Sequence, residues 1–343
     1  MIQRTTAVAV FGASGHTGKF VVREIHRREL RAIRIGRDLQ TLEIHSDPAW
    51  DDEIRVANVE NADSLDAALK GASVVINCAG PFLDTALPVL DAALRAGIPY
   101  VDVAAEQAIV RTIFDTRHQA AQDAGMAVVP AMAFYGGLAD LLASALVEDT
   151  EAVDEIDVVI GLDSWHPTQG TRLTGQRNNV PRVIQRGGRL ELVPNSPRKG
   201  HWDFPEPIGR REIVGQPFSE VITIASHLNV DTISPWINVE PLQDLRDTST
   251  PPPELEDQSG RSSQRFAMDV VVRSGEARRT ARAQGRDIYH LTAPLAVEAA
   301  LRLLSGETKH SSGAYAPGAM FDAKSFLDGL GVADFEVSYS ESL

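Results

Sequence analysis

The stretch TAVAVFGASGHTGKF, residues 6–20, decides the fold. Its first part, residues 6–11, is an apolar, β-branched run that predicts a buried strand. Gly12, Gly15 and Gly18 follow directly, and a helical pattern begins after them. In nucleotide-binding α/β proteins such glycines let the backbone approach a pyrophosphate, and the first N–H groups of the helix bind it. The spacing is GxxGxxG instead of the commoner GxGxxG, and a turn that only shapes the chain is the alternative.

Strands and helices alternate along the first 150 residues. Further predicted strands lie at residues 31–36, 53–59, 72–80, 100–104 and 126–132. Predicted helices lie at residues 17–30, 62–70, 87–96, 106–124 and 138–147. This alternation predicts an α/β fold with a Rossmann-type, doubly wound parallel sheet covered by helices on both faces.

The pattern changes after about residue 150. The later predicted strands, with few helical patterns between them, are residues 153–162, 190–193, 219–228 and 265–275. We therefore expect a nucleotide-binding domain over residues 1–150 and a second, mixed α+β domain for substrate binding or oligomerisation over residues 151–343.

Two segments of the second domain leave questions open. Residues 291–304 form an amphipathic helical pattern that could pack back on the first domain. Residues 247–264 are polar and rich in Pro and Ser, which predicts a surface loop. Whether that loop closes over a site as a lid is left open, as is a homodimer.

Composition excludes several classes of protein. The 33 Lys and Arg against 47 Asp and Glu give a net charge of −14, which argues against a nucleic-acid partner. No apolar stretch reaches the ~18 residues of a membrane span. The first apolar run is too short for a signal peptide. The single cysteine, Cys78, excludes a disulfide framework, and the nine histidines show no HxxxH or HExxH spacing, so we expect no metal and a cytoplasmic protein.

The end of the second predicted strand bears on the choice of coenzyme. NAD sites usually carry an acidic residue there, which binds the ribose hydroxyls. Here the strand ends in Gly36 and Arg37, and Asp38 follows. Because a guanidinium suits a 2′-phosphate by charge and shape, Arg37 favours NADP(H) over NAD(H). A solvated surface arginine is the alternative.

Several motifs resemble those of the saccharopine dehydrogenase-like family, which includes trans-acting enoyl reductases. They occur in the family's order: GASGHTGKFV (12–21), IGRDLQTL (35–42), VANVENADSLDAAL (56–69), VVINCAGPF (74–82), AGIPYVDVAAE (96–106) and VVPAMAFYGGLADLLA (128–143). The resemblance implies an NADP-binding Rossmann domain and a mixed α/β substrate domain. It also implies hydride transfer, often to or from an imine or a conjugated alkene.

The resemblance also assigns coenzyme-binding residues. The phosphate and adenosine contacts it implies are Gly12, Ser14, Gly15, His16, Thr17, Gly18 and Arg37, with Asn58 beside the adenine. The turn at the nicotinamide side is Ala79, Gly80 and Pro81. Where many relatives carry a glycine after the YVD motif, this chain has Ala105, so the identity of the substrate does not transfer.

Hydride transfer to a polarised double bond needs a proton donor. None of the five tyrosines has a lysine four residues later, which argues against the mechanism of short-chain dehydrogenases. The remaining candidates follow predicted strands: Asp102, Glu106 and Tyr135. Arg172 could bind an anionic substrate, although a solvated loop is the simpler interpretation. We expect an NADP(H)-dependent oxidoreductase of a small organic substrate; the alternative is a non-catalytic NADP(H)-binding sensor or partner protein.

Overall fold

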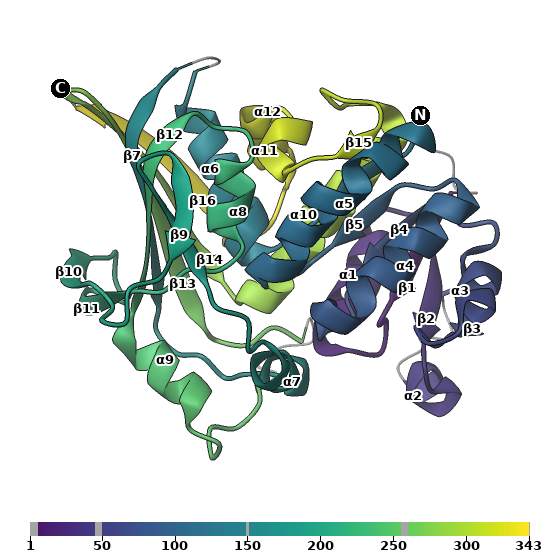
Figure 1. Ribbon diagram of the computed structural model, residues 1–343. Coiled ribbons are helices and arrows are strands. Elements are labelled where there is room, and N and C mark those ends of the chain that lie inside the picture. The colour runs from purple at the N-terminus through teal and green to yellow at the C-terminus, as the bar shows by residue number, and fades with distance from the viewer. Residues whose placement is uncertain (1–5, 45–49, 149–150, 255–259, 343) are drawn as a thin grey trace.

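The computed structural model describes residues 6–44, 50–148, 151–254 and 260–342, which form two sheets with helices on and between them (Figure 1). The first sheet has seven parallel strands in the order β15-β6-β5-β4-β1-β2-β3. This order reverses at β1 and β4, which places the crevice of a doubly wound sheet at their carboxyl ends. The predicted Rossmann-type fold is confirmed.

The elements of this sheet follow the predicted alternation. Its strands are β1 (Ala7–Phe11), β2 (Arg31–Gly36), β3 (Glu53–Val56), β4 (Val74–Asn77), β5 (Tyr100–Asp102), β6 (Ala127–Val129) and β15 (Gly313–Ala314). Its helices are α1 (His16–Arg27), α2 (Leu39–Ile44), α3 (Ala62–Leu69), α4 (Phe82–Ala96), α5 (Gln107–Asp123), the π-helical turn η1 (Phe134–Leu138) and α6 (Ala139–Leu146).

Strand β1 shows why the first apolar run is uninterrupted. Val8 and Val10 point into a core on the α1 side of the sheet, whereas Ala9 and Phe11 point into the core under α3, α4 and α5. A strand that is buried on both faces has no position for a polar residue.

Helix α4 begins earlier than predicted. It starts at Phe82 instead of residue 87, and Pro88 lies inside it. The carboxylate of Glu106 accepts a hydrogen bond from the Phe82 N–H (3.0 Å), so a distant side chain stabilises this helix end. Local sequence carries no sign of that bond.

The second sheet is mixed and has nine strands. They are β7 (Val153–Leu162), β8 (Val183–Arg186), β9 (Arg189–Leu192), β10 (Lys199–Asp203), β11 (Arg210–Gly215), β12 (Val230–Asn238), β13 (Arg265–Ser274), β14 (Ala277–Arg286) and β16 (Glu336–Ser342). The helices of this half are α7 (Gln169–Arg177), α8 (Glu220–Ala225), α9 (Val239–Arg246), α10 (Ile288–Ser305), α11 (Pro317–Met320) and α12 (Ala323–Gly329).

One predicted strand is wrong. Residues 219–228 are rich in β-branched residues, yet they contain helix α8. Val221 and Ile224 pack into the core that contains β7, while Ile222 packs into the core that contains α5. Burial between two apolar surfaces removes the polar face that would distinguish a helix from a strand, and tertiary packing overrides the local preference.

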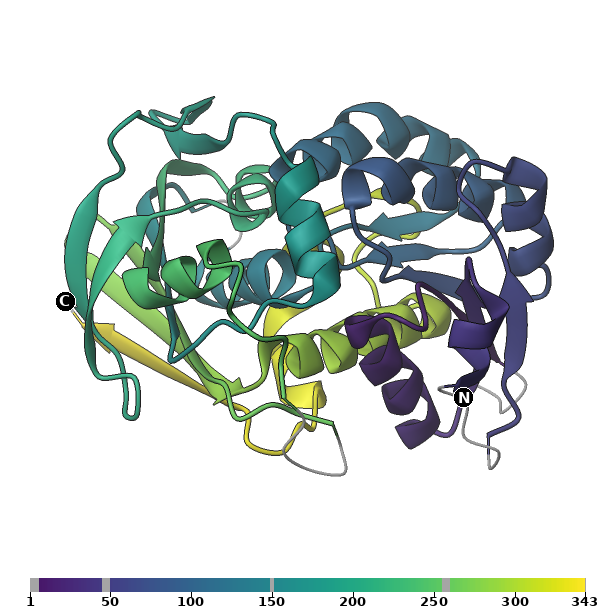
Figure 2. The ribbon, with the colours of Figure 1, turned by 90° about the horizontal axis from the view of Figure 1, so that it is seen from below.

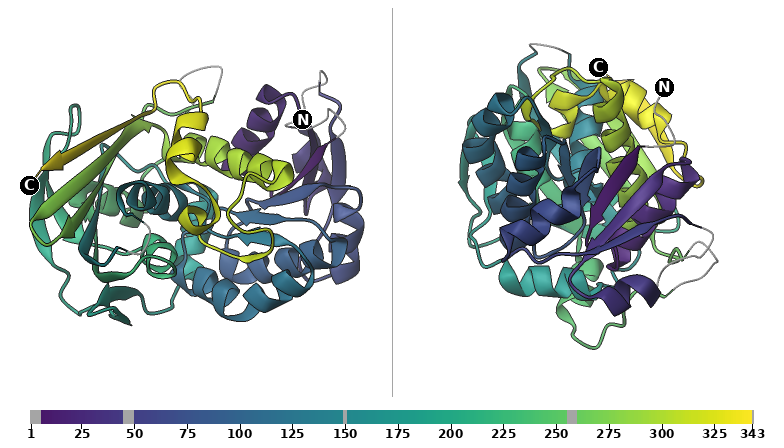
Figure 3. Two further views of the ribbon diagram at one scale, coloured as in Figure 1. Left: turned by 90° about the horizontal axis from the view of Figure 1, so that it is seen from above. Right: turned by 90° about the vertical axis from the view of Figure 1, so that its right-hand side faces the viewer.

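Helix α10 lies between the two sheets (Figures 2 and 3). It runs beside α1 and also contacts β4 and β5. The sequence predicted an amphipathic helix, but most of the α10 side chains are buried, because the helix has protein on nearly every side. The chain then returns to the first sheet, where β15 pairs with β6.

A single hydrophobic core joins the two sheets. It includes Val10 of β1, Leu295 of α10, Val158 of β7 and Val270 of β13. The two sheets are therefore packed as one unit, and the division at residue 150 stays a prediction. Within the described residues, no helix has the length and apolar character needed to cross a membrane.

Candidate active site

The turn between β1 and α1 requires glycine at two positions. Gly12 has φ +84°, and a Cβ there would lie 2.9 Å from the Ala79 backbone. A Cβ on Gly18 would lie 2.1 Å from the Gly12 carbonyl oxygen. The Gly12 N–H also donates to the Ile35 carbonyl (2.9 Å), which attaches the turn to β2. The turn is thus tightly packed against the ends of β2 and β4.

The outer side of the same turn is accessible. Gly15 is exposed, and Ser14, His16 and Thr17 are partly exposed. A Cβ on Gly15 would meet only the Gly12 carbonyl oxygen (3.2 Å), so a side chain there would project over the start of α1. The first turn of α1 contains no acidic residue. This helix end suits an anionic group, because its N–H groups and dipole face outward and no carboxylate competes.

His16, in the β1–α1 turn, contacts the second half of the chain. Its ring packs edge-on against Phe20 (5.1 Å between centroids) and against Tyr289 of α10 (5.2 Å). Its Nε2 is buried without a hydrogen-bond partner. Burial lowers the pKa of His16, which favours the neutral ring at pH 7.

The residues after β2 separate the two coenzyme alternatives. Asp38 Oδ1 accepts hydrogen bonds from the backbone N–H and the hydroxyl of Thr41, both at 2.7 Å, and thereby stabilises the first turn of α2. The Thr41 hydroxyl is the main reason that the pKa of Asp38 is lowered. Arg37 is exposed beside it. One oxygen of the Asp38 carboxylate is therefore engaged locally, and the Arg37 guanidinium is accessible. Asn58, exposed after β3, accepts a bond from the Glu60 N–H (3.2 Å).

The turn after β4 meets helix α7 from the second half of the chain. Gly80 and Pro81 are joined by a cis peptide bond, and a Cβ on Gly80 would lie 2.7 Å from Thr174 Oγ1. An ion pair between Arg177 and Asp84 (2.9 Å) attaches α7 to α4. None of the side chains of α7 is buried, and it lies between the two halves in Figure 1. Polar contacts therefore hold α7 across the crevice.

Asp102 is the centre of a buried hydrogen-bond network at the carboxyl ends of the strands. Its Oδ1 accepts from the N–H groups of Ala104 (3.0 Å) and Ala131 (2.8 Å), and its Oδ2 accepts from the Tyr100 hydroxyl (3.0 Å). Asn77 in turn donates to that hydroxyl (3.2 Å). Burial raises the pKa of Asp102 even though these bonds oppose the shift. The carboxylate holds the ends of β4, β5 and β6 in place.

Glu106 has a similar structural environment. Its Oε1 accepts from the Phe82 N–H at the start of α4, and its Oε2 accepts from the Ala105 N–H (3.1 Å). The side chain is 2% exposed, and burial raises its pKa. Both oxygens of this carboxyl group are therefore occupied by backbone donors.

Tyr135 differs from the two carboxyl groups. Its ring stacks on Phe218 (4.2 Å between centroids) and lies near Trp165 (5.8 Å). Its hydroxyl is buried without a hydrogen-bond partner. Burial, followed by the neighbouring Tyr289 and Glu220, raises the pKa of Tyr135 well above its usual value. A buried, unpartnered hydroxyl costs free energy, so it requires an explanation.

Two residues near Tyr135, Glu220 and Arg182, carry no sequence signal that would predict a functional role. Glu220 is fully buried at the start of α8; its Oε1 accepts from the Phe218 N–H (2.9 Å), while its Oε2 has no partner. The Arg182 guanidinium lies over the Phe218 ring (5.5 Å to the centroid). Glu220 stood in a segment predicted as a strand, and no spacing relates Arg182 to it.

Arg172 and the polar loop of residues 247–264 are held by hydrogen bonds within the second half of the chain. Arg172 donates to the carbonyl oxygens of Asp247 (3.1 Å) and Thr250 (2.8 Å), so it holds the start of the polar loop. At the other end of that loop, the Ser262 N–H and hydroxyl bond to Asp287 (2.7 and 3.0 Å). Residues 255–259 of this loop lie outside the described residues. Within the described part, no group of three or more potential metal ligands is present.

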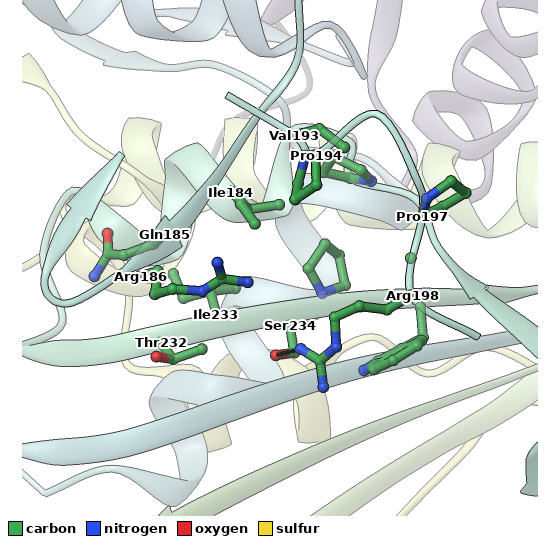
Figure 4. Close-up of a pocket in the computed structure, with 14 residues that line it drawn as sticks. Ile184, Gln185, Arg186, Val193, Pro194, Pro197, Arg198, Thr232, Ile233 and Ser234 are labelled. Carbon is green, nitrogen blue, oxygen red and sulfur yellow. Dashed lines mark hydrogen bonds between the residues drawn. The ribbon is translucent and has the colours of Figure 1, made fainter. Parts of the chain in front are cut away.

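A pocket on the second sheet lies beside the β8–β9 hairpin (Figure 4). Arg198 lies over the Trp236 ring (4.6 Å to the centroid) and donates to the Ser234 hydroxyl (3.0 Å). That hydroxyl donates to Glu155 (2.8 Å). Arg198 and Ser234 at this pocket thus have hydrogen-bond partners, in contrast to the Tyr135 hydroxyl.

The first third of the chain is similar to a known protein family. Residues 8–129 match the family described as the saccharopine dehydrogenase NADP binding domain. Over these residues the chain resembles a saccharopine dehydrogenase NADP-binding domain. The resemblance predicted from the sequence is confirmed.

Curated relatives of this saccharopine dehydrogenase-type domain are oxidoreductases by name. The chain is 30% identical over 157 residues to the saccharopine dehydrogenase-like oxidoreductase of Homo sapiens, which covers 40% of this chain and 37% of that protein. It is 30% identical over 146 residues to the trans-acting enoyl reductase of Mycobacterium ulcerans (strain Agy99), covering 40% and 35%. The matched region thus spans little more than a third of these relatives.

The fold is similar beyond the saccharopine dehydrogenase-type domain. The apo histidine-tagged saccharopine dehydrogenase (L-Glu forming) from Saccharomyces cerevisiae superposes with a TM-score of 0.68, at 12% sequence identity. The superposition covers 98% of this chain and 100% of that chain. At this identity the likeness concerns the fold alone, including the second mixed sheet.

Proposed function

We propose that this protein is an NADP(H)-dependent oxidoreductase that transfers a hydride to or from a small organic substrate, an imine or amino acid or a conjugated alkene. The observation that supports it most directly is the β1–α1 turn. Glycine is sterically required at Gly12 and Gly18, and the accessible helix start beyond Gly15 carries no acid. The names of the relatives support the reaction type.

The coenzyme-binding residues are proposed by position. Those for the phosphates are Gly12, Ser14, Gly15, His16, Thr17 and Gly18. We assign the 2′-phosphate to Arg37 and the adenine to Asn58. The nicotinamide side is assigned to Ala79, Gly80 and Pro81. When bound, the coenzyme supplies or accepts the hydride; the chain binds it, excludes water and moves the accompanying proton.

NADP(H) is proposed in preference to NAD(H) because of the contrast between Arg37 and Asp38. The bonds from Thr41 to Asp38 Oδ1 fix the orientation of this carboxylate at the start of α2. Arg37 is exposed at the same strand end and can pair with a phosphate in two-pronged geometry.

Among Asp102, Glu106 and Tyr135, we propose Tyr135 as the proton donor. Both carboxyl groups already accept bonds on each oxygen, which supports a positioning role for them. The Tyr135 hydroxyl has no partner and follows β6 at the carboxyl edge of the sheet. A phenol can donate a proton to a carbonyl oxygen or an imine nitrogen as charge develops there.

The test is a coenzyme titration followed by a substrate screen. We expect the purified protein to bind NADPH more tightly than NADH, and Arg37→Asp to weaken NADPH binding at least about tenfold more than NADH binding. Arg246→Asp, an exposed site on α9, is the charge-matched control and should change neither affinity. Equal losses for both coenzymes would contradict the role of Arg37.

Turnover is then measured as NADPH oxidation with imines, enones and mixtures of amino acids with keto acids. Oxidation that Gly15→Asp abolishes supports an enzyme, because the new carboxylate stands at the helix start. Tight NADPH binding with no turnover across the screen would instead favour a non-catalytic NADP(H)-binding protein. The cytoplasmic location, which a single cysteine suits, and a homodimer stay predictions.

A further inference from the structure

Two buried polar atoms near the crevice lack partners, and they come from segments far apart in the sequence. Tyr135 Oη lies on η1 and Glu220 Oε2 lies at the start of α8. Tyr135 is 7% exposed and Glu220 is 0% exposed. Leaving either group unpaired costs free energy, because each could bond to water in the unfolded chain. Two such atoms in adjoining elements point to a polar ligand atom that both of them bind.

Direct contacts hold the two elements together. The Thr223 hydroxyl of α8 lies 3.3 Å from the carbonyl oxygen of Gly136, the residue after Tyr135. A Cβ on Gly136 would lie 2.7 Å from Ser219 Oγ, just before Glu220. Glycine at this position therefore allows α8 to approach η1 closely.

Phe218 links the same groups. Its ring stacks on Tyr135, its backbone N–H donates to Glu220 Oε1, and Arg182 lies over its ring. The Ser219 hydroxyl donates to the Ala104 carbonyl oxygen (3.2 Å), just after β5. The cluster formed by Tyr135, Glu220, Arg182 and Phe218 thus adjoins the carboxyl edge of the first sheet.

We propose that protonated Glu220 and Tyr135 both donate to one acceptor atom of the substrate, a carbonyl oxygen or imine nitrogen, and that Glu220 replaces the proton that Tyr135 gives up. This inference rests on the proposed function. The Tyr135 Oη–H bond breaks as the acceptor atom gains that proton, and the two electrons reach the substrate carbon with the hydride that the bound coenzyme supplies. The Glu220 Oε2–H proton then passes to Tyr135 Oη.

The surroundings of Glu220 suit this role. Burial raises its pKa to about 7, so the acid and the carboxylate are both accessible near neutral pH. The positive charge of Arg182 stabilises the Glu220 carboxylate that remains after proton transfer. A carboxyl group that is protonated when the substrate arrives can donate a hydrogen bond, and an ionised one cannot.

Other titratable groups on the elements packed against α8 are either hydrogen-bonded already or at least partly exposed to solvent. Asp140 on α6 is buried and bonded to His227 (2.7 Å) and to the Gly318 N–H (2.7 Å). The remaining ones on α5, β8 and β12 are exposed or partly exposed: Arg111, Asp115, Arg117, His118, Asp123, Arg186 and Asp231. Arg182 is therefore the charge that we expect to tune Glu220.

The first arm of the experiment needs no coenzyme. Infrared difference spectra of the whole protein are recorded across a pH titration for the wild type, Glu220→Gln and Thr223→Val. We expect a protonated-carboxyl band with a midpoint near pH 7 that Glu220→Gln removes and Thr223→Val retains. Bands of buried Asp102 and Glu106 should remain in both variants. If Glu220→Gln leaves the titrating band unchanged, the proposal is wrong, whatever the outcome of the substrate screen.

The second arm uses NADPH and the substrate found in the screen. We expect Tyr135→Phe and Glu220→Gln each to lower kcat at least about tenfold without changing NADPH affinity, and the double variant to be no slower than Tyr135→Phe. The fall in kcat above pH 7 should disappear in Glu220→Gln and persist in Thr223→Val, which alters the same helix. Losses that multiply in the double variant would show that the two residues act separately and would overturn the proposal. If the wild type itself turns over none of the substrates, the proposed function is contradicted instead.

Discussion

The end of β5 and the start of α8 both carry buried carboxyl groups, but their hydrogen bonding differs. Asp102 and Glu106 accept bonds on both oxygens, mainly from backbone N–H groups. Glu220 accepts on one oxygen and leaves the other unpartnered. A fully bonded carboxylate stabilises the fold at its site, whereas a half-bonded one carries a free-energy cost that a ligand can relieve. Burial alone does not distinguish the two cases.

The largest loss of folding stability should come from removing the fully bonded carboxylate of Asp102. Asp102→Ala leaves the Ala131 and Ala104 N–H groups and the Tyr100 hydroxyl without their acceptor. We expect a loss of about 3–5 kcal/mol in the free energy of unfolding, measured by urea denaturation. Asp102→Asn keeps one oxygen acceptor and should lose less. A loss below about 1 kcal/mol for Asp102→Ala would contradict the structural role.

Glu220 should instead show its effect as a pH dependence. Its pKa is raised from 4.5 to about 7 by burial, so the folded protein retains a proton that the unfolded chain releases. The stability that this group contributes is present below pH 4.5 and is lost as pH rises through about 7. The loss is on the order of 3 kcal/mol.

Urea denaturation of the wild type and Glu220→Gln at pH 5 and pH 8 measures this contribution. The fall in stability between the two pH values should be smaller in Glu220→Gln, while Thr223→Val should behave as the wild type does. The comparison between variants separates Glu220 from Asp102 and Glu106, whose pKa values are also raised. An identical pH dependence in wild type and Glu220→Gln would show that Glu220 ionises normally in the folded protein.

A smaller loss is expected at Glu106. Glu106→Gln keeps an amide oxygen for the Phe82 N–H but turns an NH2 group toward the Ala105 N–H. We expect about 1–2 kcal/mol of destabilisation, because one capping bond survives and one is replaced by two facing donors. Thermal unfolding checks this value. A destabilisation as large as that of Asp102→Ala would mean that Glu106 does more than cap α4.

The smallest change in stability is expected when the exposed ion pair that attaches α7 to α4 is removed. Asp84→Asn removes the partner of Arg177 at the surface, where water and salt weaken the attraction. We expect an unchanged Tm at physiological salt. NADPH dissociation, measured by stopped-flow fluorescence, should become faster, because α7 lies against Gly80, which we assign to the nicotinamide side. An unchanged dissociation rate would show that α7 does not retain the coenzyme.

The parallel sheet and its glycine turn follow from local features of the sequence. The apolar run of β1, the glycines at positions 12 and 18 and the caps of α3 are local features, since backbone dihedrals and nearest-neighbour contacts produce them. Asn61 caps α3 by accepting a bond from the Ser64 N–H (3.0 Å), and Gly71 follows with φ +76°. For the same reason the family motifs could be read directly from this part of the chain.

The conformation of α8 and the surroundings of the candidate proton donors depend on long-range packing. Val221 and Ile222 favour a strand locally, but cores on two sides make the segment helical. The bond from the Ala131 N–H to Asp102 and the approach of Glu220 to Tyr135 bring together residues that are separated in the chain. No periodicity encodes such contacts, because the free energy of a buried polar group depends on which atoms the whole fold brings within hydrogen-bond distance.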